Sequence, residues 1–444
     1  MIRLFRVFVP GSTLGLFLFE SVLILSSFVF SGYLLLEVDP TDYYSSLPGV
    51  ASVALVWLSI LFGVHLLSLY SQIRVRSRLL LLQQLLMVAG VAFLFQALIS
   101  AIAPDLQVPL RVMLLGSLLS VVGIFAGRLL FSAYVLPWVG GERLLLVGNS
   151  PLLRDIASHL EKNPQSGIRV TGHIGGSASE ETGIPETGGD GQAGSLGGSI
   201  QALHPNRIVV GFEGGLSSRL AHELLELRFS GHVIEDAAGT YERICNREGL
   251  NGLNAARLLY SKEFEPGVRA LFFQAIGNCL VAAAVLVLLS PLLLLTAILV
   301  RLSSREGVLE RQVREGRKGP FNLCRFRVAD GTRIGRILSR TGLYALPQFI
   351  HVLRGQMSIV GPRPERPEFQ RELSRLIPFY PHRLNVRPGI TGWSQIQMRH
   401  LPPPRDSTAE LEHDLYYIKY FSPMLDVFIF AQAIKSLLLW GGQP

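Results

Sequence analysis

Four long apolar runs occupy the first third of the chain, at about residues 12–36, 49–70, 79–103 and 109–137. Each run can cross a bilayer as a helix, because about 20 apolar residues span the hydrocarbon core. Arg74, Arg76 and Arg78 lie between the second and third runs, whereas the loops on the other side are poor in Lys and Arg. Because positive loops stay in the cytoplasm, the pattern predicts a transmembrane four-helix bundle over 1–140 with both ends cytoplasmic.

The pattern changes after residue 140, where short apolar segments alternate with amphipathic ones. Strands are predicted at 144–147, 168–174, 207–212 and 232–236, and helices at 151–160 and 217–229. This alternation predicts a parallel, Rossmann-like α/β domain over 141–265. The G-x-G-x-x-G pattern is absent, because Gly148 is followed by Asn149, Ser150 and Pro151. No NAD is therefore expected.

A fifth apolar run covers about 270–302 and carries Ser290 and Pro291 near its middle. Proline inside a helix removes a hydrogen bond and bends the helix. A kinked helix that crosses the membrane fully remains an alternative to a broken one. The last apolar run, Met424 to Trp440, is short for a span, so we expect it to lie in the membrane interface or to pack on the core.

Composition agrees with a membrane protein that has soluble parts. Of the 444 residues, 49% are hydrophobic and 17% charged, and the mean hydropathy is +0.37. The formal charge of +8 suits anionic headgroups or anionic substrates. Three cysteines without metal-like spacing argue against disulfides and a zinc site, and suit a reducing compartment.

The segment from Thr341 to Arg366 concentrates the candidate chemistry. Leu346-Pro347-Gln348 is predicted to open a short helix that ends near Gly355, and Gly361-Pro362-Arg363-Pro364 forms a rigid basic turn. A helix start that faces a stiff arginine turn can hold a phosphate. A plain surface corner is the alternative interpretation of the turn.

Several of these motifs resemble one family. Leu-Pro-Gln at 346–348, VLRGQMSIVGPRPERPEF at 352–369 and RPGITGW at 387–393 are similar to the bacterial sugar transferases. These are polyprenyl-phosphate phosphoglycosyl transferases, and the chain resembles their long, multi-spanning, exosortase-associated subgroup. The resemblance implies a transferase domain of α/β type over 266–444, with a re-entrant membrane helix at about 270–302 that breaks at Ser290 and Pro291. It also implies a multi-pass protein of the bacterial inner membrane, with cytoplasmic soluble domains.

The resemblance implies a reaction as well. Sugar-1-phosphate passes from a nucleotide diphosphate sugar to polyprenyl phosphate, initiating exopolysaccharide or O-antigen-type synthesis, with Mg²⁺ as cofactor. No nucleic-acid partner is expected, and homo-oligomerisation is left open. The candidate phosphate-binding residues are Gln312, Arg325, Arg327, Arg333, Arg336 and Arg363.

The chain departs from the family at the catalytic dyad. The family has Asp-Glu just before Leu-Pro-Gln, and that Asp is the nucleophile, whereas this chain has Tyr344 and Ala345. Alanine has no functional group, and a phenol is mostly protonated at pH 7. The candidate substitute carboxylates are Asp330, Glu365, Glu368 and Asp414. Two functions remain open: a transferase with altered chemistry, and a non-catalytic paralogue that regulates or scaffolds the same pathway.

Overall fold

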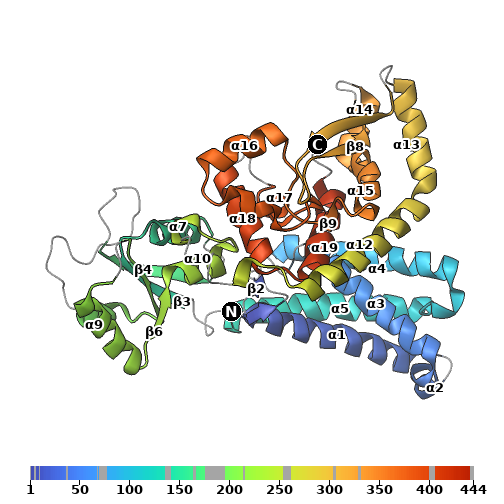
Figure 1. Cartoon of the computed structure of the whole chain (residues 1–444). Helices are drawn as coiled ribbons and strands as arrows, with labels where there is room; N and C mark the ends of the chain where they lie inside the picture. Colours follow the sequence, from blue (N-terminus) through green and yellow to red (C-terminus); the bar gives the residue numbers. More distant parts are fainter. Residues whose placement is uncertain are drawn as a thin grey trace.

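The computed structural model describes residues 2–4, 7–9, 11–36, 39–67, 69, 78–135, 142–163, 167–175, 196–213, 216–253, 262–303, 307–328, 332–399 and 406–440. Figure 1 shows a bundle of long helices, a small α/β layer to one side, and a C-terminal part of mixed structure. A short antiparallel pair, β1 (Ile2–Leu4) and β2 (Val7–Val9), precedes the bundle.

The bundle follows the predicted apolar runs. Its helices are α1 (Gly11–Leu35), α3 (Leu47–Leu66), α4 (Arg78–Ile102) and α5 (Leu110–Leu130), with the short α2 (Pro40–Ser45), η1 (Pro104–Leu106) and η2 (Phe131–Val135) between or after them. A buried ion pair ties α1 to α5, since Arg128 Nε lies 2.6 Å from Glu20 Oε1. Arg128 Nη1 also donates to the Leu69 carbonyl at 2.8 Å. Charges inside a membrane bundle need such partners.

The segment from 142 to 253 contains a four-stranded parallel sheet, as predicted. Its elements are β3 (Glu142–Gly148), α7 (Pro151–Lys162), β4 (Ile168–Ile174), α8 (Leu196–Leu203), β5 (Arg207–Gly211), α9 (Ser218–Phe229), β6 (Val233–Asp236), α10 (Ala237–Cys245) and η4 (Leu250–Gly252). The strand order is β4-β3-β5-β6, and every neighbouring pair is parallel. Separate apolar clusters pack on the two faces of the sheet.

The C-terminal part surrounds a core of aromatic and aliphatic side chains that includes Trp393, Tyr416 and Tyr417. Its helices are η5 (Lys262–Phe264), α12 (Val268–Leu288), α13 (Ser290–Ser303), α14 (Arg333–Thr341), η6 (Leu343–Gln348), α15 (Phe349–Leu353), α16 (Pro367–Leu376), η7 (Tyr380–Asn385), α17 (Trp393–Gln397), α18 (Ser407–Lys419) and α19 (Pro423–Trp440). β7 (Leu309–Arg314) pairs antiparallel with β8 (Phe321–Phe326), and β9 (Ser358–Val360) pairs parallel with β10 (Gly389–Thr391).

The fifth apolar run is broken, as the proline indicated. α12 ends at Leu288 and α13 begins at Ser290, so the break falls at Leu289. Pro291 occupies the first turn of α13, where its missing N–H removes no helical bond. Within the described residues, α12 and the four bundle helices are the five that are long and apolar enough to cross a membrane. The last apolar run, α19, packs on the core, where Leu425 and Ile429 are fully buried.

Polar contacts join the α/β segment to α18. Lys419 Nζ lies 2.8 Å from both Glu242 Oε2 and Glu248 Oε2, and all three side chains are buried. The Tyr241 hydroxyl donates to Glu412 Oε2 at 3.0 Å. The residues before α12 and those after α13 thus contact one another, as expected if α12 and α13 form the predicted re-entrant helix.

A topology measurement tests the re-entrant prediction. We expect reporters fused after Ile200 and after Pro444 to be both cytoplasmic, because the arginines at 74–78 predict the orientation of the bundle and a re-entrant α12–α13 segment would return the chain to the side where it entered. The readout is alkaline phosphatase against green fluorescent protein activity at each fusion point. A periplasmic C-terminal reporter combined with a cytoplasmic one at residue 200 would show that α12 crosses fully. The re-entrant geometry and the predicted domain boundaries stay predictions until then.

Candidate functional site

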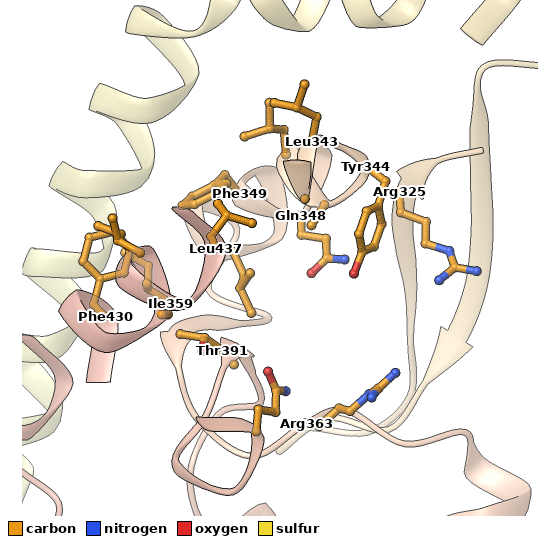
Figure 2. Close-up of a pocket in the computed structure, with 18 of the residues that line it drawn as sticks. Arg325, Leu343, Tyr344, Gln348, Phe349, Ile359, Arg363, Thr391, Phe430 and Leu437 are labelled. Atoms are coloured by element: carbon orange, nitrogen blue, oxygen red, sulfur yellow. The ribbon is translucent and has the colours of Figure 1, made fainter. Parts of the chain in front are cut away.

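A cavity of about 480 Å³ lies where η6, α12, α17, α19 and the loops after β9 and β10 meet. Figure 2 shows that the cavity has two chemically different sides. The apolar side gathers Phe349, Ile359, Phe430 and Leu437, while Arg325 and Arg363 border the open space on the other side. Val285 and Leu289 also line the apolar side, so the cavity reaches the membrane helix α12. One site therefore offers an apolar wall beside a cationic one.

All four charged side chains that line the cavity are arginines. They are Arg314, Arg325, Arg363 and Arg399, and they come from β7, β8, the loop after β9 and the residues after α17. No Asp or Glu is among the described lining residues. The wall is therefore suited to an anion.

The hairpin β7–β8 positions two of the four arginines. Arg325 donates from Nε to Glu310 Oε2 at 3.0 Å across the antiparallel pair. Gln312 accepts from Arg314 Nη2 at 2.7 Å, and Arg314 Nη1 donates to the Pro364 carbonyl at 3.1 Å. Burial raises the pKa of Glu310, but hydrogen bonds from Arg325 and Gln312 outweigh it, so the net shift is downward. Glu310 thus stays ionised and orients Arg325 from behind the wall.

Arg363 is carried by a backbone loop pressed against the residues around β10. Gly361 N donates to the Thr391 carbonyl at 2.9 Å, and Gly389 N donates to the Pro362 carbonyl at 2.9 Å. A Cβ at Gly361 would overlap the Arg387 carbonyl, so only glycine allows this approach. The Arg363 side chain is exposed and has no ion-pair or hydrogen-bond partner among the described residues. It is available to a ligand.

The two dyad positions lie in η6 and both line the cavity. Gly342, at φ +70, starts η6, and Ala345 N donates to its carbonyl at 3.0 Å. The prediction that Leu346-Pro347-Gln348 opens the helix is wrong in detail. Pro347 lies inside the 3₁₀ turn, and α15 begins only at Phe349. The i to i+3 bonding that starts at Gly342 sets this tighter turn before the α-helix can form.

Tyr344 directs its ring into the open space bordered by Arg325 and Arg363 (Figure 2). Burial raises the pKa of the Tyr344 phenol, and the nearby Arg363 and Arg325 oppose that shift without cancelling it. The phenol is therefore protonated at neutral pH. In this state it donates a hydrogen bond and is a poor nucleophile.

The other predicted phosphate-binding residues are placed differently. Gln312 lies one layer behind the cavity and supports Arg314. Arg327 follows β8, and its backbone N–H donates to the Val308 carbonyl at 3.0 Å. Arg333 and Arg336 lie on the exposed face of α14, because Gly335 and Leu338 face inward. None of these four residues lines the cavity.

None of the described substitute carboxylates lines the cavity either. Asp414 is buried, with Oδ2 2.7 Å from Arg383 Nη2 and Oδ1 accepting from Ser394 at 2.8 Å. Glu365 is half-buried beside the cavity loop, and Glu368 is exposed on α16. Asp330 lies outside the described residues.

The lining side chains do not fit Mg²⁺. Mg²⁺ prefers carboxylate oxygens and water, whereas every charged group on this wall is a cation. Across the described ranges no group of three or more His, Cys, Asp or Glu side chains could hold a metal. No chemical step is therefore assigned to a metal here.

Sequence reasoning missed Arg314, Arg399 and the α19 wall. Arg314 lies two residues after Gln312 on one strand, so the period of two places both on the same face and could have indicated it. Arg399 had no such signal, because only the packing of α17 brings it to the cavity. The apolar wall could not be predicted, because it forms only through the tertiary contact between α19 and α12.

The family described as "Bacterial sugar transferase" matches residues 269–439, a range that includes the whole cavity. A Rhizobium leguminosarum protein, "Exopolysaccharide production protein PSS", is 36% identical over an alignment of 182 residues, and the match covers 35% of this chain and 90% of that protein. The chain belongs to the bacterial sugar transferase family.

Two longer relatives are named by their reactions. The "UDP-N-acetylgalactosamine-undecaprenyl-phosphate N-acetylgalactosaminephosphotransferase" of Aeromonas hydrophila is 39% identical over 36% of this chain and 42% of that protein. The "UDP-glucose:undecaprenyl-phosphate glucose-1-phosphate transferase" of Escherichia coli K12 is 34% identical over 51% of this chain and 53% of that protein. The chain thus matches about half the length of these relatives, or less.

Proposed function

We propose that this chain binds polyprenyl phosphate and a nucleotide diphosphate sugar at the cytoplasmic face of the inner membrane. It would act at the step that initiates an exopolysaccharide or O-antigen-type polymer. One observation carries this proposal: a single cavity combines four arginines with an apolar wall that reaches α12. A polyprenyl phosphate has the matching form, a charged head on an apolar chain, and the longer relatives are named for undecaprenyl phosphate and UDP-sugars.

The same cavity argues against the family's usual covalent route in the wild-type chain. The lining offers Tyr344 and Ala345 where the family has its Asp-Glu dyad, and no described carboxylate takes their place. We therefore propose a binding paralogue that regulates or scaffolds initiation, with little transfer of its own. The division into 1–140, 141–265 and 266–444 belongs to the same proposal, in which the bundle anchors the chain.

A second candidate is catalysis through another nucleophile. It is favoured by the phenol of Tyr344, which stands at the nucleophile's position inside the cavity. The raised pKa of that phenol weighs against it. Transfer by the wild-type protein, abolished in Tyr344→Phe, would select this candidate.

Arg363→Gln tests the binding proposal. We expect about a 10- to 100-fold loss of affinity for farnesyl phosphate, a short soluble analogue of the lipid carrier, because one charge-assisted contact contributes about 1.5–3 kcal/mol. The measurement is microscale thermophoresis on the full chain in nanodiscs. Arg375→Gln, an exposed arginine of α16 away from the cavity, is the matched control. Equal affinity in both variants would contradict the assignment of the cavity.

A further inference from the structure

We propose that this cavity holds a phosphate group without a divalent cation, in a receptor made only of hydrogen-bond donors: the Tyr344 hydroxyl and the Arg325 and Arg363 guanidiniums. The ligand class is a phosphomonoester on an apolar chain. The inference rests on the proposed function, and it adds which groups balance the negative charge of the bound phosphate. It departs from the Mg²⁺ that the family resemblance implies.

Three hydrogen-bond donors converge on one space. Tyr344 comes from η6, Arg325 from β8 and Arg363 from the loop after β9, yet all three border one open space (Figure 2). Both arginines are close enough to shift the titration of the Tyr344 phenol. Donors from three separate elements around one space match the several oxygens of a phosphate.

The positive charge around the cavity is only partly compensated. Glu310 offsets Arg325, but the Arg363 side chain has no ion-pair or hydrogen-bond partner among the described residues, and Arg314 Nε is buried without a hydrogen-bond acceptor there. Burial also lowers the pKa of Arg314, as do the neighbouring Arg363, Arg366 and Arg325, while Glu365 acts in the opposite direction. Positive charges gathered in this way are stabilised by an anion and destabilised by a further cation.

Tyr344 and Ala345 leave the two dyad positions without a carboxylate. Two carboxylates at these positions would repel a phosphate, and a divalent cation would be needed to offset that repulsion. Here the phenol donates and the alanine is neutral, so neither the repulsion nor the ligands for a metal remain. The loss of the dyad thus converts a metal-requiring position into a direct phosphate contact.

The apolar wall selects among phosphates. Phe430 and Leu437 of α19 lie on the side away from Arg325 and Arg363 (Figure 2), and Leu289 beside α12 also lines the cavity. An isoprenoid chain would bury its surface there, whereas inorganic phosphate would gain only the polar contacts. A prenyl phosphate should therefore bind more tightly than either phosphate or the free prenol.

The test uses the full chain in nanodiscs, titrated with farnesyl phosphate in EDTA or in excess MgCl₂. We expect wild-type affinities in the two buffers to agree within about twofold. Tyr344→Phe should lose about 5- to 10-fold in both buffers, because one hydroxyl donor is gone while the ring still packs. Inorganic phosphate and farnesol, titrated separately, should each bind at least about 10-fold more weakly than farnesyl phosphate.

The Tyr344→Asp variant is the more discriminating part of this test. It places a carboxylate among the donors, so we expect affinity in EDTA to fall about 100-fold and to recover at least about 10-fold with MgCl₂. Thermal melting of each variant checks that the fold persists, and Tyr344→Phe carries the test if the aspartate variant unfolds. A wild-type affinity that rises 10-fold or more with MgCl₂ overturns the inference. Absence of wild-type binding in both buffers instead contradicts the proposed function.

Discussion

Replacing Tyr344 by Asp together with Ala345 by Glu should create sugar-1-phosphate transfer where the wild-type chain shows little. Loss of a covalent nucleophile costs roughly 10⁴ to 10⁶ in rate, so even partial restoration should raise the rate about 100-fold or more. The physical reason is that both positions already line a cavity supplied with arginines. Two substitutions cannot build such a phosphate site, but they can add a nucleophile to one.

The assay is transfer of labelled sugar phosphate from a panel of UDP-sugars to polyprenyl phosphate in membranes with Mg²⁺. Adding Arg363→Gln to the restored protein is the control, because it removes a phosphate contact and should return the rate toward background. Substantial transfer by the wild-type protein would refute the claim that Tyr344 and Ala345 disable the covalent route. If the restored protein stays silent across the panel, the cavity does not hold its substrates in a reactive geometry.

Arg383→Met should give the largest loss of stability. Arg383 is 1% exposed, lies 2.7 Å from Asp414 and 3.2 Å from Glu410, and also donates to the Tyr380 hydroxyl. Breaking a buried ion pair by removing one partner costs about 3–5 kcal/mol, because the other charge stays buried without compensation. We expect the melting temperature in detergent to fall by about 10 °C, measured by differential scanning fluorimetry.

Two further variants distinguish the loss of the buried ion pair from the general effect of removing an arginine. Arg375→Met removes an exposed guanidinium and should leave the melting temperature within about 2 °C of wild type. Arg383→Met combined with Asp414→Asn should recover part of the loss, since no full negative charge then remains at 414. Because Arg383 Nη2 also donates to the Arg363 carbonyl at 3.3 Å, the single variant should weaken phosphate binding too. An unchanged melting temperature would show that the buried pair contributes little.

The elements that sequence predicted well are those whose pattern repeats over many residues. The predicted ends of the bundle helices differ from the observed ones by one to seven residues, with the largest difference where α5 ends at Leu130. β4 was predicted without error at Ile168 to Ile174, because β-branched residues are enriched in this segment (IRVTGHI), as is typical of a strand. The hairpin β7–β8 escaped prediction. Half-buried positions in its strands are occupied by charged side chains that pair across the hairpin. These charges hide the apolar pattern by which a strand is recognised in a sequence.

The candidate site was predictable only where residues are close along the chain. The segment around Leu346 and the Arg363 turn were expected to face one phosphate, and both line the cavity. The positions of the predicted phosphate-binding arginines were harder to predict, because composition does not say which face of a helix turns inward. Arg333 and Arg336 point to the outer face of α14, while Arg314 and Arg399 reach the cavity through strand pairing and helix packing.

Helix α18 contacts both the C-terminal core and the α/β segment, which affects where the chain can be cut into fragments that still fold. Asp414 points into the transferase core, whereas Glu412 and Lys419 reach across to Tyr241, Glu242 and Glu248. A fragment that began at α12 would keep every residue that lines the cavity. Lys419 and Glu412 would, however, lose their ion-pair and hydrogen-bond partners in the α/β segment. Unpaired charges in such places destabilise a fold. We therefore expect a fragment that begins at α12 to be less stable than one that also includes the α/β segment 142–253.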